Sequence, residues 1–102
     1  MVRFEWDEAK ARVNQRKHGV GFEIASHVFD DPDALVQRDR IEGGEYRWQT
    51  LGLVGGVLLL LVAHTVRLED DEDEIIRIIS ARRADRKERI RYEKEQKKNR
   101  EF

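Results

Sequence analysis

The pattern of apolar and polar residues near the start of the chain predicts two short helices, the first of which has only a thin apolar face. Asp7 is a suitable N-cap for a helix from Glu8 to about His18, and Gly19 is a suitable residue to end it. A second short helix is predicted from Phe22 or Glu23 to Phe29, where apolar residues recur three and seven positions apart. The following Asp31-Pro32 requires an extended exit from this helix.

The middle of the chain has the patterns of β-strands. Gly43-Gly44 and Gly55-Gly56 mark turns between successive strands, and the run of Val and Leu after the second turn lacks alternation, which is typical of a central strand. The predicted strands are Ala34 to Arg38, Glu45 to Leu53, Val57 to Thr65 and Ile75 to Ala81.

Two charged segments complete the pattern. Six consecutive acidic residues at 69–74 repel one another and predict a solvated loop between the last two strands. Residues 83–98 are strong helix formers with few apolar positions, so they predict a basic C-terminal helix that projects or waits for a partner. The expected fold class is α+β: two N-terminal helices, an antiparallel meander of about four strands and a C-terminal helix, in one domain over 1–102.

Overall charge excludes little, but its distribution is uneven. The chain has 20 Lys+Arg and 21 Asp+Glu. From Arg82 onward there are ten Lys+Arg and five Asp+Glu, a net of +5, which leaves 10 minus 16, or -6, for the preceding part. A basic tail therefore follows an acidic body.

Composition also limits the class of protein. The 102 residues contain no cysteine, which excludes disulfides, thiolate metal sites and thiol nucleophiles. The most apolar stretch, Leu51 to Ala63, is interrupted by glycines and too short to span a bilayer, and no secretory signal is apparent. We therefore expect a soluble cytoplasmic protein without a membrane partner.

Several positions carry side chains with possible chemistry. Arg77 interrupts an otherwise apolar strand, and a guanidinium there calls for a phosphate or carboxylate partner. Strand alternation places Arg77 and Arg82 on opposite faces unless a bulge or the start of the following helix intervenes, and it places Ser80 on the face of Arg82. His64 ends an apolar strand, where it could reach the mouth of a groove or be a half-buried structural histidine.

Other candidates have ordinary explanations as well. Lys17 and His18 lie at a helix C-terminus, where cations are favoured in any case. Arg82 and Arg83 are equally compatible with plain surface charge. Trp48 is in phase with a second aromatic residue, which suits either base stacking or a core. Arg47, on the opposite side of that strand, is a weaker phosphate-binding candidate.

Motifs along most of the chain resemble one known family. These are Phe4-Glu5-Trp6-Asp7, Lys10, Asn14, Lys17-His18-Gly19-Val20, Phe22-Glu23, Phe29-Asp30-Asp31-Pro32, Glu45-Tyr46-Arg47-Trp48, Leu51-Gly52, His64-Thr65, the run 76–84, Arg86, Glu88, Arg89 and Tyr92-Glu93. In this pattern the chain is similar to BrnT toxins. Val66 stands where the family often has Glu, and the segment 69–74 stands where family loops are short and Gly-rich.

The resemblance implies a RelE-like fold and a toxin of a type II toxin–antitoxin pair. It further implies a metal-independent RNA endonuclease that arrests growth by blocking translation. The implied partners are RNA and a ribbon-helix-helix antitoxin similar to BrnA, in a hetero-oligomer that reaches DNA only through the antitoxin. No cofactor is implied.

RNA cleavage without a metal needs a base for the 2′-OH, cations for the charge that develops on phosphorus and an acid for the leaving oxygen. The residues expected to be catalytic are His64, Arg77, Arg82 and Lys17. Those expected to contact RNA are Arg83, Arg47, Trp48, His18 and Ser80. No metal site is expected, because the acidic segment lacks the glycine and ligand spacing of a calcium loop, and the three histidines have no zinc-binding spacing.

Two readings of another class remain open. The protein could be a non-catalytic module whose basic helix binds RNA or an acidic partner. It could also be a structural subunit of a DNA-bound repressor complex.

Overall fold

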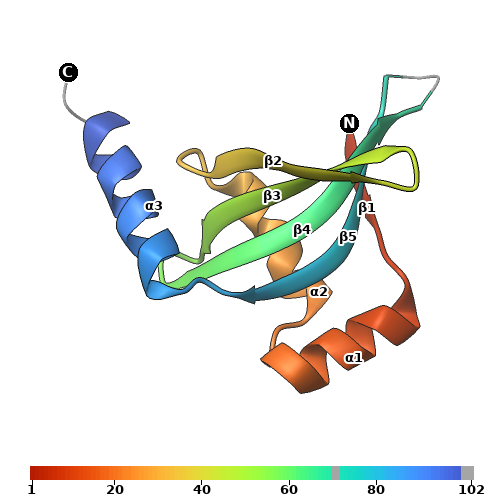
Figure 1. Ribbon diagram of the computed structural model, residues 1–102, viewed down its shortest axis with the longest axis horizontal. Helices are drawn as coiled ribbons and strands as arrows, with labels where there is room; N and C mark the ends of the chain where they lie inside the picture. Colours follow the sequence, from red (N-terminus) through yellow and green to blue (C-terminus); the bar gives the residue numbers. More distant parts are fainter. Residues whose placement is uncertain (70–71, 100–102) are drawn as a thin grey trace.

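A single mixed sheet of five strands organises the computed structural model, which describes residues 1–69 and 72–99. The strand order is β1-β5-β4-β3-β2, and the last four strands form an antiparallel meander while β1 runs parallel to β5 (Figure 1). The strands are β1 (Val2–Glu5), β2 (Leu35–Glu42), β3 (Glu45–Val54), β4 (Leu58–Leu68) and β5 (Glu74–Arg83).

The prediction of about four antiparallel strands is therefore wrong at the N-terminus. Residues Val2–Glu5 pair in parallel with the first half of β5, and Phe4 packs against Phe29 with ring centroids 5.5 Å apart. Apolar and charged residues do alternate in this segment, but four residues are too few to distinguish a strand from an irregular start.

The helices are α1 (Glu8–His18), α2 (Phe22–Ala25) and α3 (Arg86–Asn99), with a short 3₁₀ helix η1 (Ser26–Asp30) after α2. Both predicted ends of α1 are confirmed. The Asp7 carboxylate accepts a hydrogen bond from the Lys10 backbone N–H, and Gly19 ends the helix in the left-handed region at φ 72°. Its N–H donates to the Gln15 carbonyl at 2.8 Å, a bond that closes the final turn.

The other two predicted helices differ from the structure. The second is divided into α2 and η1. Phe22 and Ala25 of α2 and Val28 of η1 are buried. The C-terminal helix begins three residues later than predicted, because Arg82 and Arg83 still pair with β4 in the sheet.

Helices cover the two faces of the sheet unequally. In Figure 1, α2 lies behind the sheet, α3 stands at one end of it and α1 lies beside β5. The larger core lies between α2, η1 and the sheet; its buried members are Val20, Phe22, Ala25, Val28, Leu60, Val62, Ile78 and Ala81. A smaller core under α3 contains Leu51, Leu59, Leu61 and Tyr92. Much of the second face therefore remains open.

Gly52 allows η1 to pack directly on β3. A Cβ atom at this position would lie 2.8 Å from both the Cβ and the carbonyl oxygen of Val28. The carbonyl oxygen belongs to the backbone and cannot rotate away as a side chain can. Only glycine therefore allows this approach without a shift of η1.

The acidic segment 69–74 lies where the loop was predicted, as far as it is described. Residues 70–71 lie outside the described residues, and Glu74 already belongs to β5. Asp73 pairs with the N-terminal ammonium group at 3.4 Å and with Arg3 at 4.0 Å. Part of the segment therefore holds β1 beside β5 rather than facing only solvent.

Candidate functional site

An irregularity in the pairing of β4 with β5 brings two arginines to the same face of the sheet. His64 pairs with Ile78, but the preceding Ala63 pairs with Ser80, so β5 contains one extra residue at Ile79. Arg77 lies opposite Thr65 and Arg82 opposite Leu61, and residues four apart on β4 point to the same face. Strand alternation alone would place the two arginines on opposite faces, and this bulge is what brings them to the same one.

These arginines belong to a patch that we call the open face. It covers β3, β4 and β5 beyond the area that α3 covers, and its alternating positions follow from the strand register. Its members are Arg47, Gln49, Ala63, Thr65, Arg77, Ser80 and Arg82. Six of these seven residues carry polar or charged side chains, whereas the neighbouring area under α3 is apolar.

The end of α1 adds two more predicted residues to this patch. Lys17 and His18 line a groove of about 370 Å³ together with Ser80. His18 and Ser80 also line a second groove of about 250 Å³, in which Arg82 and Gln49 take part. The structure therefore brings residues from α1 and β5 together, although their sequence positions lie more than 60 apart.

Asn14 holds α1 against this part of β5. Its side-chain amide donates to the Ala81 carbonyl at 2.8 Å, and its side-chain oxygen accepts from the Ala81 N–H at 3.1 Å. A further bond of 3.3 Å reaches the Val20 carbonyl. Asn14 therefore acts as an edge partner for β5 between two residues of the open face, beyond the point where β1 ends.

Each arginine of the open face has a carboxylate neighbour. Arg77 lies 3.7 Å from Glu5, so its predicted need for an anionic partner is met within the chain. Arg47 lies 3.3 Å from Glu42.

The third pair is the most complete. The guanidinium of Arg82 binds both carboxylate oxygens of Glu88, at 2.8 and 2.9 Å. The hydrogen bonds of this pair raise the pKa of Arg82 and lower the pKa of Glu88. Both groups are therefore charged at neutral pH.

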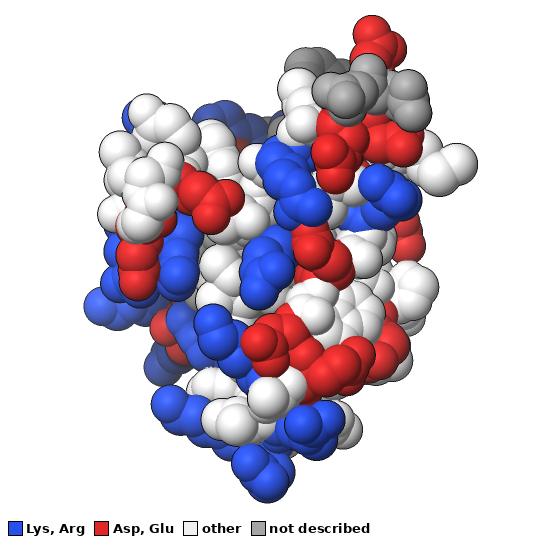
Figure 2. Space-filling view, turned by 90° about the vertical axis from the view of Figure 1, so that its right-hand side faces the viewer, with Lys and Arg blue, Asp and Glu red and all other residues white. Residues whose placement is uncertain are grey.

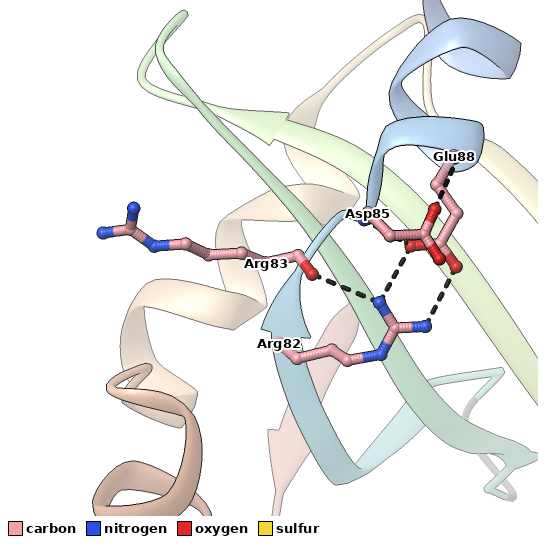
Figure 3. A network of polar contacts seen from close by, with 4 residues as sticks. All are labelled: Arg82, Arg83, Asp85 and Glu88. Carbon is pink, nitrogen blue, oxygen red and sulfur yellow. Dashed lines mark hydrogen bonds and ion pairs between the residues drawn. The ribbon is translucent and has the colours of Figure 1, made fainter.

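Two residues predicted to contact RNA lie on the other face. Arg83 pairs with Leu60 of the larger core, and its side chain extends away from Arg82 (Figure 3). Trp48 pairs with His64 and lines a separate pocket of about 490 Å³ with Tyr46, whose ring centroid is 6.4 Å away.

His64 is buried, and it also borders the pocket that Trp48 and Tyr46 line. Its side chain is on the helix-covered face, only 2% of the residue is exposed, and the ring packs edge-on against Phe29 with centroids 4.8 Å apart. Nε2 lies 2.7 Å from the Thr50 hydroxyl oxygen. Burial lowers the pKa of His64 to about 4. The strand alternation turns His64 away from Arg77 and toward η1, so His64 does not share a face with the predicted arginines.

Glu88 was noted only as part of the family motif, although a local signal for its role exists. Asp85-Arg86-Lys87-Glu88 matches the spacing of a capping box, in which the first and fourth residues bond each other's backbone N–H at the start of a helix. Asn14 was noted only as part of a motif. No local pattern could show that its amide reaches Ala81, which is 67 residues away.

The described residues contain neither a cluster suited to a metal ion nor a helix suited to cross a membrane. Residues 1–69 and 72–99 contain no group of three or more side chains suited to hold a metal ion. Among the same residues no helix has the length and apolar character needed to cross a membrane.

The fold and the patch together define a small α+β protein with a cationic groove on an open sheet face. The family model described as "Ribonuclease toxin, BrnT, of type II toxin-antitoxin system" matches residues 6–88. The chain belongs to this family, as the sequence motifs suggested. At family level it is a ribonuclease toxin with an antitoxin as its partner.

A solved structure has the same fold. It is the crystal structure of the Brucella abortus ribonuclease toxin BrnT, which is 22% identical, with a TM-score of 0.64 over 84% of this chain and 100% of the Brucella chain. At this identity the likeness concerns the fold alone. No curated protein sequence matches the chain.

Proposed function

We propose that this chain is a metal-independent RNA endonuclease that cleaves on the open face. The observation that carries the proposal is the bulge at Ile79, which puts Arg77 on the same face as Ser80 and Arg82. Ser80 and Arg82 line a groove with His18 at the end of α1. Guanidinium groups on one rigid sheet can bind successive phosphates and stabilise the charge that develops on the reacting one.

In this proposal each side chain has a defined task. Arg77 and Arg82 bind phosphate, Lys17 adds positive charge at the groove, and Ser80 donates a hydrogen bond. His18 supplies an imidazole, the side chain best suited to accept and donate protons near neutral pH. His64 lies outside this group and has a packing role. Arg83 and Trp48 contact only RNA that extends around the sheet.

The 2′-OH of the substrate is the nucleophile. Its proton passes to the base, O2′ bonds to phosphorus, and the bond from phosphorus to O5′ breaks as O5′ takes up a proton. The products are a 2′,3′-cyclic phosphate and a 5′-hydroxyl. Growth arrest follows from the loss of translated RNA.

The wider biological setting is also part of the proposal. The toxin is cytoplasmic, has a RelE-like fold and is neutralised by a ribbon-helix-helix antitoxin similar to BrnA. Their hetero-oligomer reaches DNA through the antitoxin.

Incubation of the purified chain with total RNA in excess EDTA tests the activity. We expect cleavage with 2′,3′-cyclic phosphate ends and a loss of at least tenfold in rate for Arg77→Ala and Arg82→Ala. Arg12→Ala is the matched control, since Arg12 is exposed on α1 and lines neither groove. RNA retention without cleavage would indicate a binding module, and neither retention nor cleavage would indicate a structural subunit. Cleavage ends with a 3′-hydroxyl would contradict the mechanism.

A further inference from the structure

The guanidinium of Arg82 is fixed on two sides. Nη1 donates to Glu88 Oε1 at 2.8 Å and Nη2 donates to Oε2 at 2.9 Å, while Nη1 also donates to the Arg83 carbonyl at 3.2 Å (Figure 3). A bidentate pair of this kind sets the plane of the guanidinium as well as its position. Arg82 is thus held in one orientation before any substrate arrives.

Glu88 is itself fixed by the first turn of α3. Its Oε1 accepts a hydrogen bond from the Asp85 N–H at 2.9 Å, and its own N–H donates to Asp85 Oδ1 at 2.8 Å. These reciprocal bonds form a capping box, which satisfies two N–H groups at the start of the helix. The Glu88 side chain is only 16% exposed. Its orientation is therefore set by the backbone of α3.

Counting donors shows what remains of Arg82 for a ligand. A guanidinium has five N–H bonds, and Glu88 with the Arg83 carbonyl takes three of them. The two left over are the Nε–H and the outer Nη2–H, which lie on one edge and match two oxygens of a phosphate. Within residues 1–69 and 72–99 no hydrogen bond or ion pair is found on this edge. Arg82 borders the groove that His18 and Ser80 also line.

We propose that Glu88 is a positioning residue for RNA cleavage. Glu88 binds the edge formed by Nη1 and Nη2 of Arg82. The edge formed by Nε and Nη2 is then oriented to receive the reacting phosphate. This inference rests on the proposed function of the open face. Glu88 is not itself a proton acceptor in the reaction, because its carboxylate is occupied by Arg82 and the Asp85 N–H.

The variant Glu88→Gln separates positioning from simple charge. It keeps one oxygen but places an NH₂ group against a guanidinium N–H, so the bidentate pair is lost. Loss of a negative charge beside the groove should leave binding of uncleavable 2′-O-methyl RNA equal or tighter. We expect kcat to fall about tenfold nonetheless, since Arg82 is no longer preorganised. Glu93→Gln removes the same charge from an exposed position of α3 and should change neither quantity more than twofold.

A double-mutant cycle with Arg82→Ala gives the decisive comparison. If Glu88 acts through Arg82, Glu88→Gln has no additional effect on kcat in the Arg82→Ala background. An equal loss of kcat in both backgrounds would indicate a purely structural role and overturn the inference. So would an unchanged kcat of Glu88→Gln in a wild-type chain that cleaves RNA.

Nuclear magnetic resonance keeps this test separate from the proposed function. If the wild-type chain does not cleave RNA, the proposed function fails, and the Arg82 Nε–H resonance still reports on positioning. We expect this resonance to shift when a 2′-O-methyl RNA is added to the wild-type chain and to shift much less in Glu88→Gln. Equal shifts in both proteins, or none in the wild type, would refute the positioning role.

Discussion

At the scale of single residues, His64 and Arg82 show how neighbours decide the chemistry of a side chain. Both lie on adjacent strands in segments that the family motif includes. His64 points toward η1, where burial favours its neutral form. Arg82 points to the open face, where Glu88 favours its charged form. The sequence left open whether His64 reaches a groove or is a half-buried structural histidine, because strand alternation alone does not tell which face a helix covers.

The buried His64 should make the stability of the fold depend on pH. The unfolded chain binds a proton at His64 below pH 6.5, whereas the folded chain does so only near pH 4. Stability is therefore retained above pH 6.5 and falls as the pH drops toward 4. Between pH 7 and pH 5 we expect a loss of roughly 2 kcal/mol from this residue.

Urea unfolding of the wild-type chain and His64→Gln at both pH values measures this loss. The variant should lose less stability between pH 7 and pH 5 than the wild type does. His27→Gln, at an exposed position, should behave like the wild type. The same pH dependence in all three proteins would refute the assignment of His64 to the core.

At the scale of elements, the meander and α1 were predictable because their signals are local. Hydrophobic runs, glycine turns and an N-cap all act within a few residues. The β-strand at Val2–Glu5 and the bulge at Ile79 were not predicted as such, because both depend on pairing between distant segments. The bulge decides the candidate site, since it places Arg77 and Arg82 on one face. Residues on α1 and β5 were therefore predicted as candidates, but their convergence was not.

The attachment of α1 to β5 gives a prediction at this scale. Asn14→Ala removes the partner of the Ala81 N–H and carbonyl groups, which are buried. An unsatisfied buried backbone group costs on the order of 1–3 kcal/mol, so we expect the free energy of unfolding to fall by about 2 kcal/mol or more. Urea unfolding measures the change. Gln15→Ala, at the exposed neighbouring position, should cost less than about 0.5 kcal/mol, and equal losses would contradict the role of Asn14.

At the scale of the whole molecule, charge is distributed unevenly along the fold. Figure 2 shows one side of the protein, where Lys and Arg gather at the lower end, at the level of α1, while acidic and basic residues lie side by side above it. Helix α3 continues the basic part. It has seven Lys+Arg and three Glu, a net of +4, and Tyr92 is its one buried residue. The Tyr92 hydroxyl donates to Asp31 at 2.6 Å, which anchors the helix near its middle. Most of the basic surface of α3 therefore faces outward.

This outward surface leads to a prediction about the antitoxin. We expect it to dock on the open face around Arg77 and Arg82 and on α3, so that acidic side chains neutralise the cations that would otherwise bind phosphate. Association should weaken as salt increases, because exposed charges are screened beyond about 10 Å at 0.1 M ionic strength. The double variant Arg89→Glu and Lys94→Glu places opposite charges on α3. It should weaken binding at least tenfold in calorimetry at low salt and reduce the salt dependence.

Arg12→Glu with Arg16→Glu makes the same change on α1, away from the proposed interface, and should bind as the parent does. If the α1 variant loses as much affinity as the α3 variant, long-range attraction alone explains the effect. If neither loses affinity, the antitoxin binds elsewhere, and the exposed apolar pocket beside Trp48 is then the surface to test next.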